Sequence, residues 1–383
     1  DLRRTIHHRV GQLYEEQLDS PKKAIEAYKN QLDDDMSDIE AMRALERLYE
    51  QTESWKELVN VLRQIEDQAE DGTERRRCMV KVAEVLAGEL EEREDAIVAW
   101  RSVLDDFGPT GPVLGSLVDL YEGAELWAEL AETVETWLDL SEDDDERIEL
   151  LSSLGDVRLQ RLEDPNGALE AYREVLSIES ENDEVRESVA GMLSHEDPDI
   201  KRQCAEILGP LYEAEGAAEK LLKVREIEVD CTEDPAEKLQ ILGGMLHTAE
   251  EIAQNEERAF AYACRGVQEA VEEASLPDWI DRAERLANAT SSWGELVDLY
   301  ESTVDRVLDA EIQQSVRMAA AELARDQLED SARAIRLFEL ALESEGDDQD
   351  AMEALEALYE EGEDHEALLR ILNRLAEHAE DRG

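Results

Sequence analysis

Residues that could do chemistry are few and scattered in this sequence. Its 383 residues include 6 histidines and 4 cysteines. His7 and His8 are adjacent, and neighbouring residues on a helix point about 100° apart, so they cannot chelate one ion from one face. The cysteines stand alone, with no CxxC pair and no histidine at metal-ligand spacing: Cys78, Cys204, Cys231 and Cys264.

The motifs of enzymes and of cation sites are also missing. The sequence has no Gly-rich phosphate loop, no nucleophile elbow and no His-x-x-x-His pair. Acidic runs such as Asp33-Asp34-Asp35 do not follow the calcium-loop pattern, which needs a glycine and a closing glutamate. We therefore expect no catalytic residue, no cofactor and no bound metal, and a protein that is not an enzyme.

The charge of the chain limits its partners. Acidic residues number 99 against 39 Lys plus Arg, which gives a formal net charge of -60. Such a charge repels nucleic-acid phosphates and anionic lipid and favours a basic partner, although adaptation to salt would produce the same composition. No stretch approaches the roughly 18 apolar residues of a membrane helix, so we expect no membrane insertion. The sequence leaves the compartment unknown, and a cytoplasmic location is the first expectation.

Internal repeats organise the whole sequence. The segment AIEAYKNQL, with Ala24 and Tyr28, recurs 72 residues later around Trp100 and again around Tyr172, and weaker copies surround Ala259 and Ala334. A second anchor recurs in the same order, at spacings of 72, 91, 75 and 72 residues: Trp55, Trp127, Ala218, Trp293 and His365. The 91-residue step places an insertion in the third copy.

These spacings predict one continuous helical array of five modules. The modules are 1–72, 73–144, 145–235 with an extra helix near 183–216, 236–309 and 310–383. Each module divides again, because Tyr14 precedes Tyr49 by 35 residues, the length of one helix-turn-helix unit. Apolar residues at i, i+3 and i+4 give each helix a stripe that only stacked neighbours can bury. We predict an all-α protein of about 21 helices, with Tyr28, Trp100 and Tyr172 buried between hairpins.

The repeat resembles that of the tetratricopeptide repeat (TPR) family. A Val10-Gly11 pair, Tyr14 three positions on, and a second helix with Ala24 and Tyr28 carry the resemblance. The second unit departs from it, because Glu46 replaces the glycine. The paired, acidic module is similar to long TPR proteins of myxobacterial-type bacteria. The resemblance implies a right-handed α-solenoid of stacked helix-turn-helix repeats, whose groove binds a protein or peptide.

In the TPR family the first helix of each repeat lines the groove. Carried over to this sequence, the resemblance predicts eight groove residues: His8, Gln12, Arg43, Arg47, Arg77, Glu84, Asp119 and Asp156. The N-terminal part of such a groove would be locally basic. A solvated charged face is the alternative interpretation.

Three functions remain open from the sequence. The first is an interaction scaffold or adaptor that presents an extended groove to a protein or peptide. The second is a structural spacer, and the third is the regulatory repeat region of a larger enzyme or sensor. Because RILNRLAEHAEDRG at the end of the sequence matches VLRQIEDQAEDGTE, which another module follows, we also expect the natural array to be longer.

Overall fold

The computed structural model describes residues 2–344 and 348–381 and is built from helices. Those ranges contain 21 α-helices and no strand, which confirms the all-α prediction. A one-turn π-helix, η1 (Thr248–Ile252), and a short 3₁₀ helix, η2 (Val304–Arg306), complete the elements. Contacts within the chain form two compact units, Asp1–Val185 and Arg186–Gly383.

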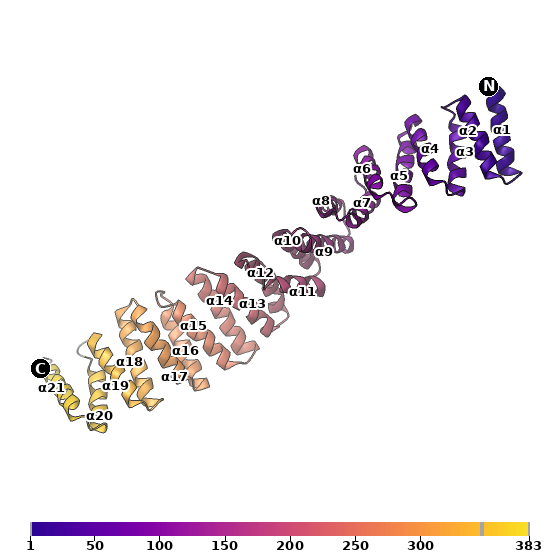
Figure 1. Cartoon of the computed structure of the whole chain (residues 1–383). Helices are drawn as coiled ribbons and strands as arrows, with labels where there is room; N and C mark the ends of the chain where they lie inside the picture. The colour runs from indigo at the N-terminus through magenta and orange to yellow at the C-terminus, as the bar shows by residue number, and fades with distance from the viewer. Residues whose placement is uncertain (1, 345–347, 382–383) are drawn as a thin grey trace. The chain divides into compact units, whose positions relative to one another are not determined.

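The first unit is a series of helical hairpins in which each helix packs against the next (Figure 1). Its helices are α1 (Leu2–Glu16), α2 (Pro21–Asp34), α3 (Ile39–Gln51), α4 (Trp55–Gln68), α5 (Gly72–Gly88), α6 (Arg93–Phe107), α7 (Gly111–Gly123), α8 (Trp127–Leu138), α9 (Asp144–Gln160) and α10 (Pro165–Ile178).

The second unit repeats this arrangement. The division between the units lies inside α11 (Asp183–Met192), in the segment where the sequence predicts an extra helix; the five-module array itself stays a prediction. The remaining helices are α12 (Pro198–Ala214), α13 (Ala218–Cys231), α14 (Pro235–His247), α15 (Glu256–Glu269), α16 (Leu276–Thr290), α17 (Trp293–Thr303), α18 (Ala310–Asp326), α19 (Ser331–Ser344), α20 (Gln349–Glu361) and α21 (His365–Asp381).

Capping residues explain where many of these helices begin. The side chain of Asp164 accepts a hydrogen bond from the backbone N–H of Gly167, and Asp234 caps α14 in the same way. A proline follows each of them in the first turn, where its missing N–H costs nothing. Ser20 also precedes a proline, but its side chain makes no capping hydrogen bond.

Large aromatic residues on the second helix of a hairpin pack on small residues of the first. Tyr28 and Tyr172 are buried, and their rings lie against Gly11 and Gly155, which have no side chain to obstruct them. Trp100 is buried at the equivalent position, against a cluster that contains Ala83. Burial of all three aromatics confirms the prediction from the repeat.

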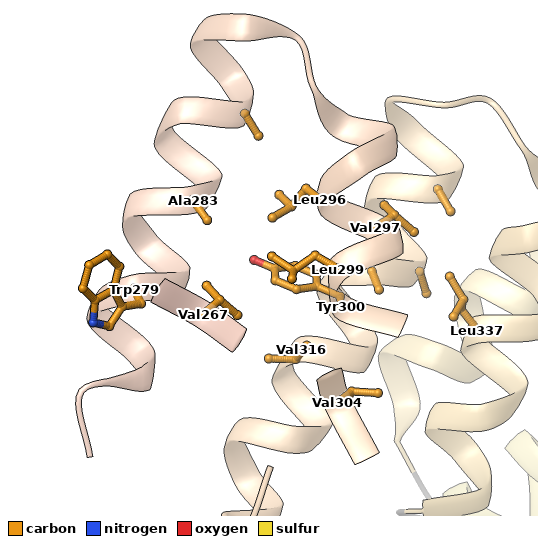
Figure 2. Packing of buried hydrophobic residues seen from close by; sticks show 14 of the residues in the cluster. Val267, Trp279, Ala283, Leu296, Val297, Leu299, Tyr300, Val304, Val316 and Leu337 are labelled. Atoms are coloured by element: carbon orange, nitrogen blue, oxygen red, sulfur yellow. The ribbon is translucent and has the colours of Figure 1, made fainter. Parts of the chain in front are cut away.

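The second unit contains an extended core cluster that runs from α13 to α21, and Trp279 and Tyr300 are buried in it (Figure 2). Trp279 lies on Gly266, another glycine that leaves room for a ring. The Tyr300 hydroxyl donates a hydrogen bond to Glu284, at 2.9 Å, so that its polar end is satisfied. The same device recurs in the first unit, where the Tyr172 hydroxyl donates to Asp156 at 2.7 Å.

Candidate binding surfaces

The eight groove residues predicted from the sequence all lie on odd-numbered helices of the first unit. We call this set the first-helix face: His8 and Gln12 on α1, Arg43 and Arg47 on α3, Arg77 and Glu84 on α5, Asp119 on α7, and Asp156 on α9. These are the first helices of successive hairpins, as the repeat register requires. Binding of a partner at the first-helix face stays a prediction.

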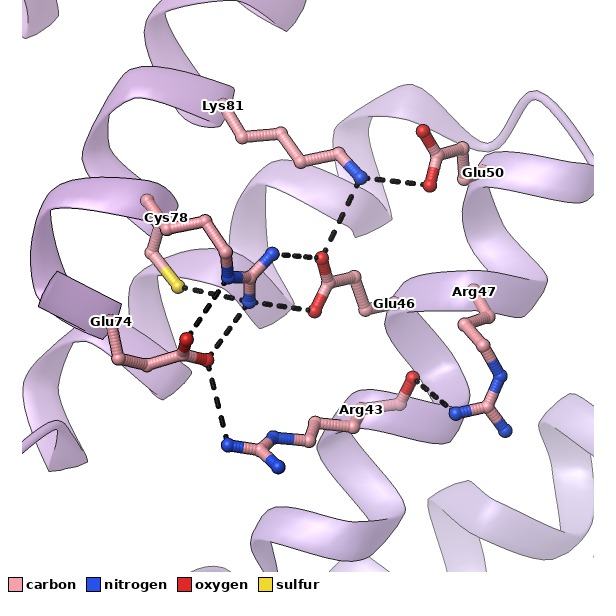
Figure 3. Close-up of polar contacts among 8 residues, drawn as sticks. Arg43, Glu46, Arg47, Glu50, Glu74, Cys78 and Lys81 are labelled. Carbon is pink, nitrogen blue, oxygen red and sulfur yellow. Dashed lines mark hydrogen bonds and ion pairs between the residues drawn. The ribbon is translucent and has the colours of Figure 1, made fainter.

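Arg77 is the centre of a polar network on this face (Figure 3). Its guanidinium donates to both oxygens of Glu46, at 2.6 and 3.1 Å, and to Glu74 of its own helix, at 3.0 and 3.1 Å. The hydrogen bonds to Glu46, followed by those to Glu74, raise the pKa of Arg77 above its usual range. The hydrogen bond from Arg77 in turn lowers the pKa of Glu74.

The other two arginines of the face are also paired. Arg43 lies 3.7 Å from Glu74, and Arg47 lies 3.2 Å from Glu15. The carboxylates Glu15, Glu46 and Glu74 balance the three arginines, and the groove pattern predicted from the sequence includes none of them. This part of the face is therefore a lattice of ion pairs across α1, α3 and α5, without an excess of positive charge.

The other five predicted residues form two pairs and one exposed single residue. His8 and Asp156 contact the packed tyrosines: the His8 ring lies edge-on to Tyr28, with centroids 5.9 Å apart, and Asp156 accepts from Tyr172. The Nδ1 atom of His8 is buried without a hydrogen-bond partner. Glu84 and Asp119 instead line a common hollow of about 770 Å³. Gln12 is exposed on α1.

A second hollow, which the sequence analysis missed, lies in the second unit. We call it the α12–α14 cavity: it has a volume of about 520 Å³ and lies among α12, α13, α14 and η1. Its apolar lining includes Leu221, Ile241 and Ile252. Gly244 of α14 lines the cavity and leaves space beside the helix, because a Cβ atom added at this residue would meet nothing within 4 Å.

Charged side chains surround this apolar lining. Arg225 pairs with Glu228 at 2.6 Å and lies 3.6 Å from Glu213, so its charge is neutralised by its own neighbours. Glu206 and Glu237 also line the cavity, and both are exposed. Arg202 lines the cavity as well and lies 3.5 Å from Asp199 of its own helix. With two arginines against Glu206, Glu213, Glu228 and Glu237, the cavity combines an apolar surface with a surplus of carboxylates.

The π-helix η1 shapes one edge of the cavity. It begins at Thr248, whose hydroxyl donates to the carbonyl of Gly244 at 2.9 Å, and it ends at the exposed Ile252. Short π-helical turns inside helices are frequent at functional sites, because they re-aim side chains that a regular helix would place elsewhere. The adjacent pair Gly243-Gly244 in the sequence was the one available signal for an open helix surface here.

Within residues 2–344 and 348–381, no three His, Cys, Asp or Glu side chains are grouped so that they could hold a metal ion. The described helices also include none that is both long and apolar enough to pass through a membrane.

Comparison with known proteins finds similarity to solved structures only. No protein-family model and no curated protein matches the sequence. Among solved structures, the Naa15/Naa10 complex bound to HypK-THB is 13% identical, with a TM-score of 0.39 over 96% of this chain and 57% of that chain. A tetratricopeptide repeat protein from Parabacteroides merdae is 10% identical, with a TM-score of 0.30, over 83% of this chain and 98% of that one. Yeast Tom70 is 14% identical, with a TM-score of 0.26, over 98% of this chain and 91% of that one.

The hairpins themselves define the class of fold. Successive helices of mostly 13 to 17 residues pack as hairpins, and in the hairpins of Gly11, Gly155 and Gly266 this glycine of the first helix lies under an aromatic residue of the second. This chain has a TPR-like fold of helical-hairpin repeats.

Proposed function

We propose that this chain is a non-enzymatic interaction scaffold that holds a segment of a partner protein. The observation that carries the proposal is the α12–α14 cavity, where an open helix surface, an apolar lining and an excess of carboxylates over arginines occur together. Stacked hairpin repeats bury their cores between neighbours and leave such surfaces free along the stack, which suits binding rather than catalysis.

The chemistry of the cavity points to a segment that is apolar and basic. Leu221 and Ile241 offer apolar surface to a Leu- or Val-sized side chain. Glu206 and Glu237 can pair with a Lys or Arg of the same segment, since Arg225 is already occupied by Glu228. The net charge of -60 would draw such a segment toward the chain and raise its rate of encounter.

Two adjacent glycines provide a matched test. Gly244→Leu fills the cavity, whereas Gly243→Leu adds the same side chain to the same helix at a residue that does not line it. Neither glycine has a neighbour within 4 Å of an added Cβ, so both variants should fold. Pull-downs from native lysate with the chain and both variants, read by quantitative mass spectrometry, should show a partner lost with Gly244→Leu and kept with Gly243→Leu. A partner retained equally by both variants would exclude the cavity.

The first-helix face is the second candidate surface for the same function. Arg43 and Arg47 are largely exposed and reach only one carboxylate each, so they can exchange it for a carboxylate of a partner. The double variant Arg43→Glu, Arg47→Glu should abolish binding at the first-helix face and leave binding at the α12–α14 cavity unchanged. Unchanged or stronger binding of every recovered partner would exclude the face.

The two other functions predict different results. A spacer should recover no stoichiometric partner with either the native chain or its variants. A regulatory repeat region should recover partners only together with an attached catalytic or sensor domain, which the full-length open reading frame would reveal.

A further inference from the structure

Trp100 has an indole N–H group that the fold leaves without an acceptor. In the hairpins before and after it, the aromatic residue at the same repeat position is a tyrosine with a bonded hydroxyl. Tyr28 donates to Glu15 at 3.1 Å, and the next copy is bonded in the same way: Tyr172 donates to Asp156 at 2.7 Å. Trp100 is only 4% exposed, and its Nε1 atom is buried with no hydrogen-bond partner in the part of the chain that the structure describes. Buried donors are nearly always bonded, so this one points to a ligand.

A hollow lies beside this unbonded donor. Trp100 lines it together with Glu84 and Asp119, and its volume is about 770 Å³. We call it the α5–α7 hollow, since its other walls come from α5, the start of α6 and α7. Glu84 precedes Asp156 by 72 residues, so it has the repeat position of the carboxylate that accepts from Tyr172. The donor and the acceptor that bond each other in the next hairpin are both unpaired in this one, around a single hollow.

The α5–α7 hollow is negatively charged. Three carboxylates line it, one from α5, one from the turn after α5 and one from α7: Glu84, Glu91 and Asp119. All three are exposed, and within residues 2–344 and 348–381 none of them forms an ion pair, unlike the neighbouring Glu92. Arg93 is the basic residue of the lining, and it donates to a backbone carbonyl of the α7 terminus at 2.6 Å. Three carboxylates against one guanidinium leave an excess of negative charge.

Apolar side chains line the hollow as well. Ala87 and Leu120 are half-buried and contribute to its lining beside Trp100. The methylene stem of a long basic side chain packs on such a surface while its charged end reaches carboxylates. The three carboxylates come from separate elements, and the three donors of an ammonium can be shared among them, whereas a planar guanidinium matches one carboxylate at a time. The side chain that fits the hollow is therefore lysine.

We propose that the α5–α7 hollow binds a lysine of a partner peptide, together with a main-chain carbonyl of the same peptide. The ammonium lies among the three carboxylates, and the carbonyl accepts the hydrogen bond of the Trp100 indole N–H. Lysine has donors and no acceptor, so the acceptor comes from the peptide main chain. A volume of about 770 Å³ is enough for a lysine side chain and a few main-chain atoms. This inference rests on the proposed scaffold function and names the partner chemistry for one part of the first-helix face.

The indole N–H of Trp100 provides the readout. The chain has 6 tryptophans, and each isotope-labelled indole gives one NMR signal. Replacing the other tryptophans by phenylalanine, one at a time, assigns the signals without a change at Trp100. The probe is the tripeptide Ala-Lys-Ala, acetylated and amidated so that its ammonium is the only charge. The control tripeptide has norleucine in place of lysine, which keeps the stem and lacks the ammonium. Both are titrated into the chain at about 0.15 M salt, where attraction beyond about 8 Å is screened.

Binding of lysine makes a specific result necessary. The Trp100 signal should move to lower field, as the signal of an N–H does when it forms a hydrogen bond, and should saturate with a millimolar or lower dissociation constant. The signals of the other tryptophans should stay in place. The norleucine tripeptide should bind about tenfold more weakly or worse, because it leaves the carboxylates unpaired. A Trp100 signal that does not move, or equal binding of the two tripeptides, would overturn the proposal.

Two glycines of α5 provide a blocking variant and its control. Gly88 lines the hollow, whereas Gly72 lies at the other end of the helix and does not. A Cβ added at either residue meets nothing within 4 Å, so Gly88→Leu and Gly72→Leu should both fold. Gly88→Leu should weaken binding of the lysine tripeptide by about tenfold or more, and Gly72→Leu should leave it unchanged. The double variant Glu84→Gln, Asp119→Asn changes two exposed side chains and should weaken binding by a similar factor. Native affinity in Gly88→Leu or in the double variant would overturn the proposal.

The α12–α14 cavity is tested separately, because it belongs to the other unit. Gly244→Leu fills that cavity and should leave binding of the lysine tripeptide at the α5–α7 hollow unchanged. A tripeptide that is lost with Gly244→Leu and kept with Gly88→Leu would overturn this inference and support the cavity of the proposed function.

Discussion

The guanidinium of Arg77 donates two hydrogen bonds to the carboxylate of Glu46, at 2.6 and 3.1 Å. The two residues are 31 positions apart and lie on α5 and α3, so the pair joins successive hairpins. Glu46 is buried and occupies the place where the TPR pattern has glycine. A bidentate pair at this position offsets the cost of burying that carboxylate.

This pair should contribute measurably to stability. Arg77→Met leaves the Glu46 carboxylate with the ammonium of Lys81 at 3.6 Å as its remaining partner, so we expect a loss of about 1–2 kcal/mol in the free energy of unfolding. A double-mutant cycle with Glu46→Gln, followed by urea unfolding, should give a coupling energy of about 1 kcal/mol. The control cycle on Lys56 and Glu92, an exposed pair at 3.4 Å, should give less than about 0.5 kcal/mol. Equal coupling in the two cycles would contradict the role assigned to Glu46.

The glycine beneath Tyr172 should resist substitution. An added Cβ at Gly155 would meet the Tyr172 ring closer than any ordinary contact, so the ring must move out of its packed position. We expect Gly155→Ala to destabilise the chain by about 1–3 kcal/mol, although alanine favours a helix by about 1 kcal/mol.

Gly243→Ala is the matched control. Nothing lies within 4 Å of its added Cβ, so the same substitution should raise stability by about 0.5–1 kcal/mol. In thermal unfolding, the melting temperature should fall for Gly155→Ala and rise for Gly243→Ala. A stabilised Gly155→Ala variant would show that the Tyr172 ring can move aside for the added methyl group without loss of packing.

Burial of Tyr28, Trp100 and Tyr172 could be predicted from the sequence, because large residues that recur at one spacing occupy equivalent positions in the stack. The contacts of these rings with Gly11 and Gly155, and the binding surfaces, are seen only in the structure. The partners of Arg43, Arg47 and Arg77 come from other helices that the groove pattern ignores, so a basic face was predicted where an ion-pair lattice exists. The α12–α14 cavity depends on the π-helix at Thr248, and no local propensity marks a π-helix.

The four cysteines should differ strongly in reactivity. Burial raises the pKa of the Cys78 thiol to about 11 and that of the Cys204 and Cys264 thiols to about 12. A higher pKa leaves fewer thiolates at a given pH, and the thiolate is the nucleophile. With iodoacetamide at a pH of about 8, we expect Cys231, which is only partly buried, to be labelled at least about tenfold faster than the buried Cys78 and Cys204. Peptide mass spectrometry over time measures this, and labelling in denaturant should make the four rates equal.

The response to salt tests the largest global property of the chain. Even if every lysine and arginine were paired, an excess of 60 negative charges would remain without a basic counterpart. Their mutual repulsion opposes the compact state and is screened as the ionic strength rises, while apolar burial between hairpins is unaffected. Salt also weakens pairs such as Arg47 with Glu15, but exposed pairs contribute little each, so the relief of repulsion should dominate. We therefore expect the melting temperature to increase between about 10 mM and 0.5 M NaCl. The same measurement on Arg77→Met checks the direction of the effect, since this variant lacks a partly buried pair and has a larger excess of negative charge. Both changes should make its melting temperature rise more steeply with salt. A flat or falling melting temperature would show that the charges are already compensated locally, and the inference from net charge to a basic partner would then fail.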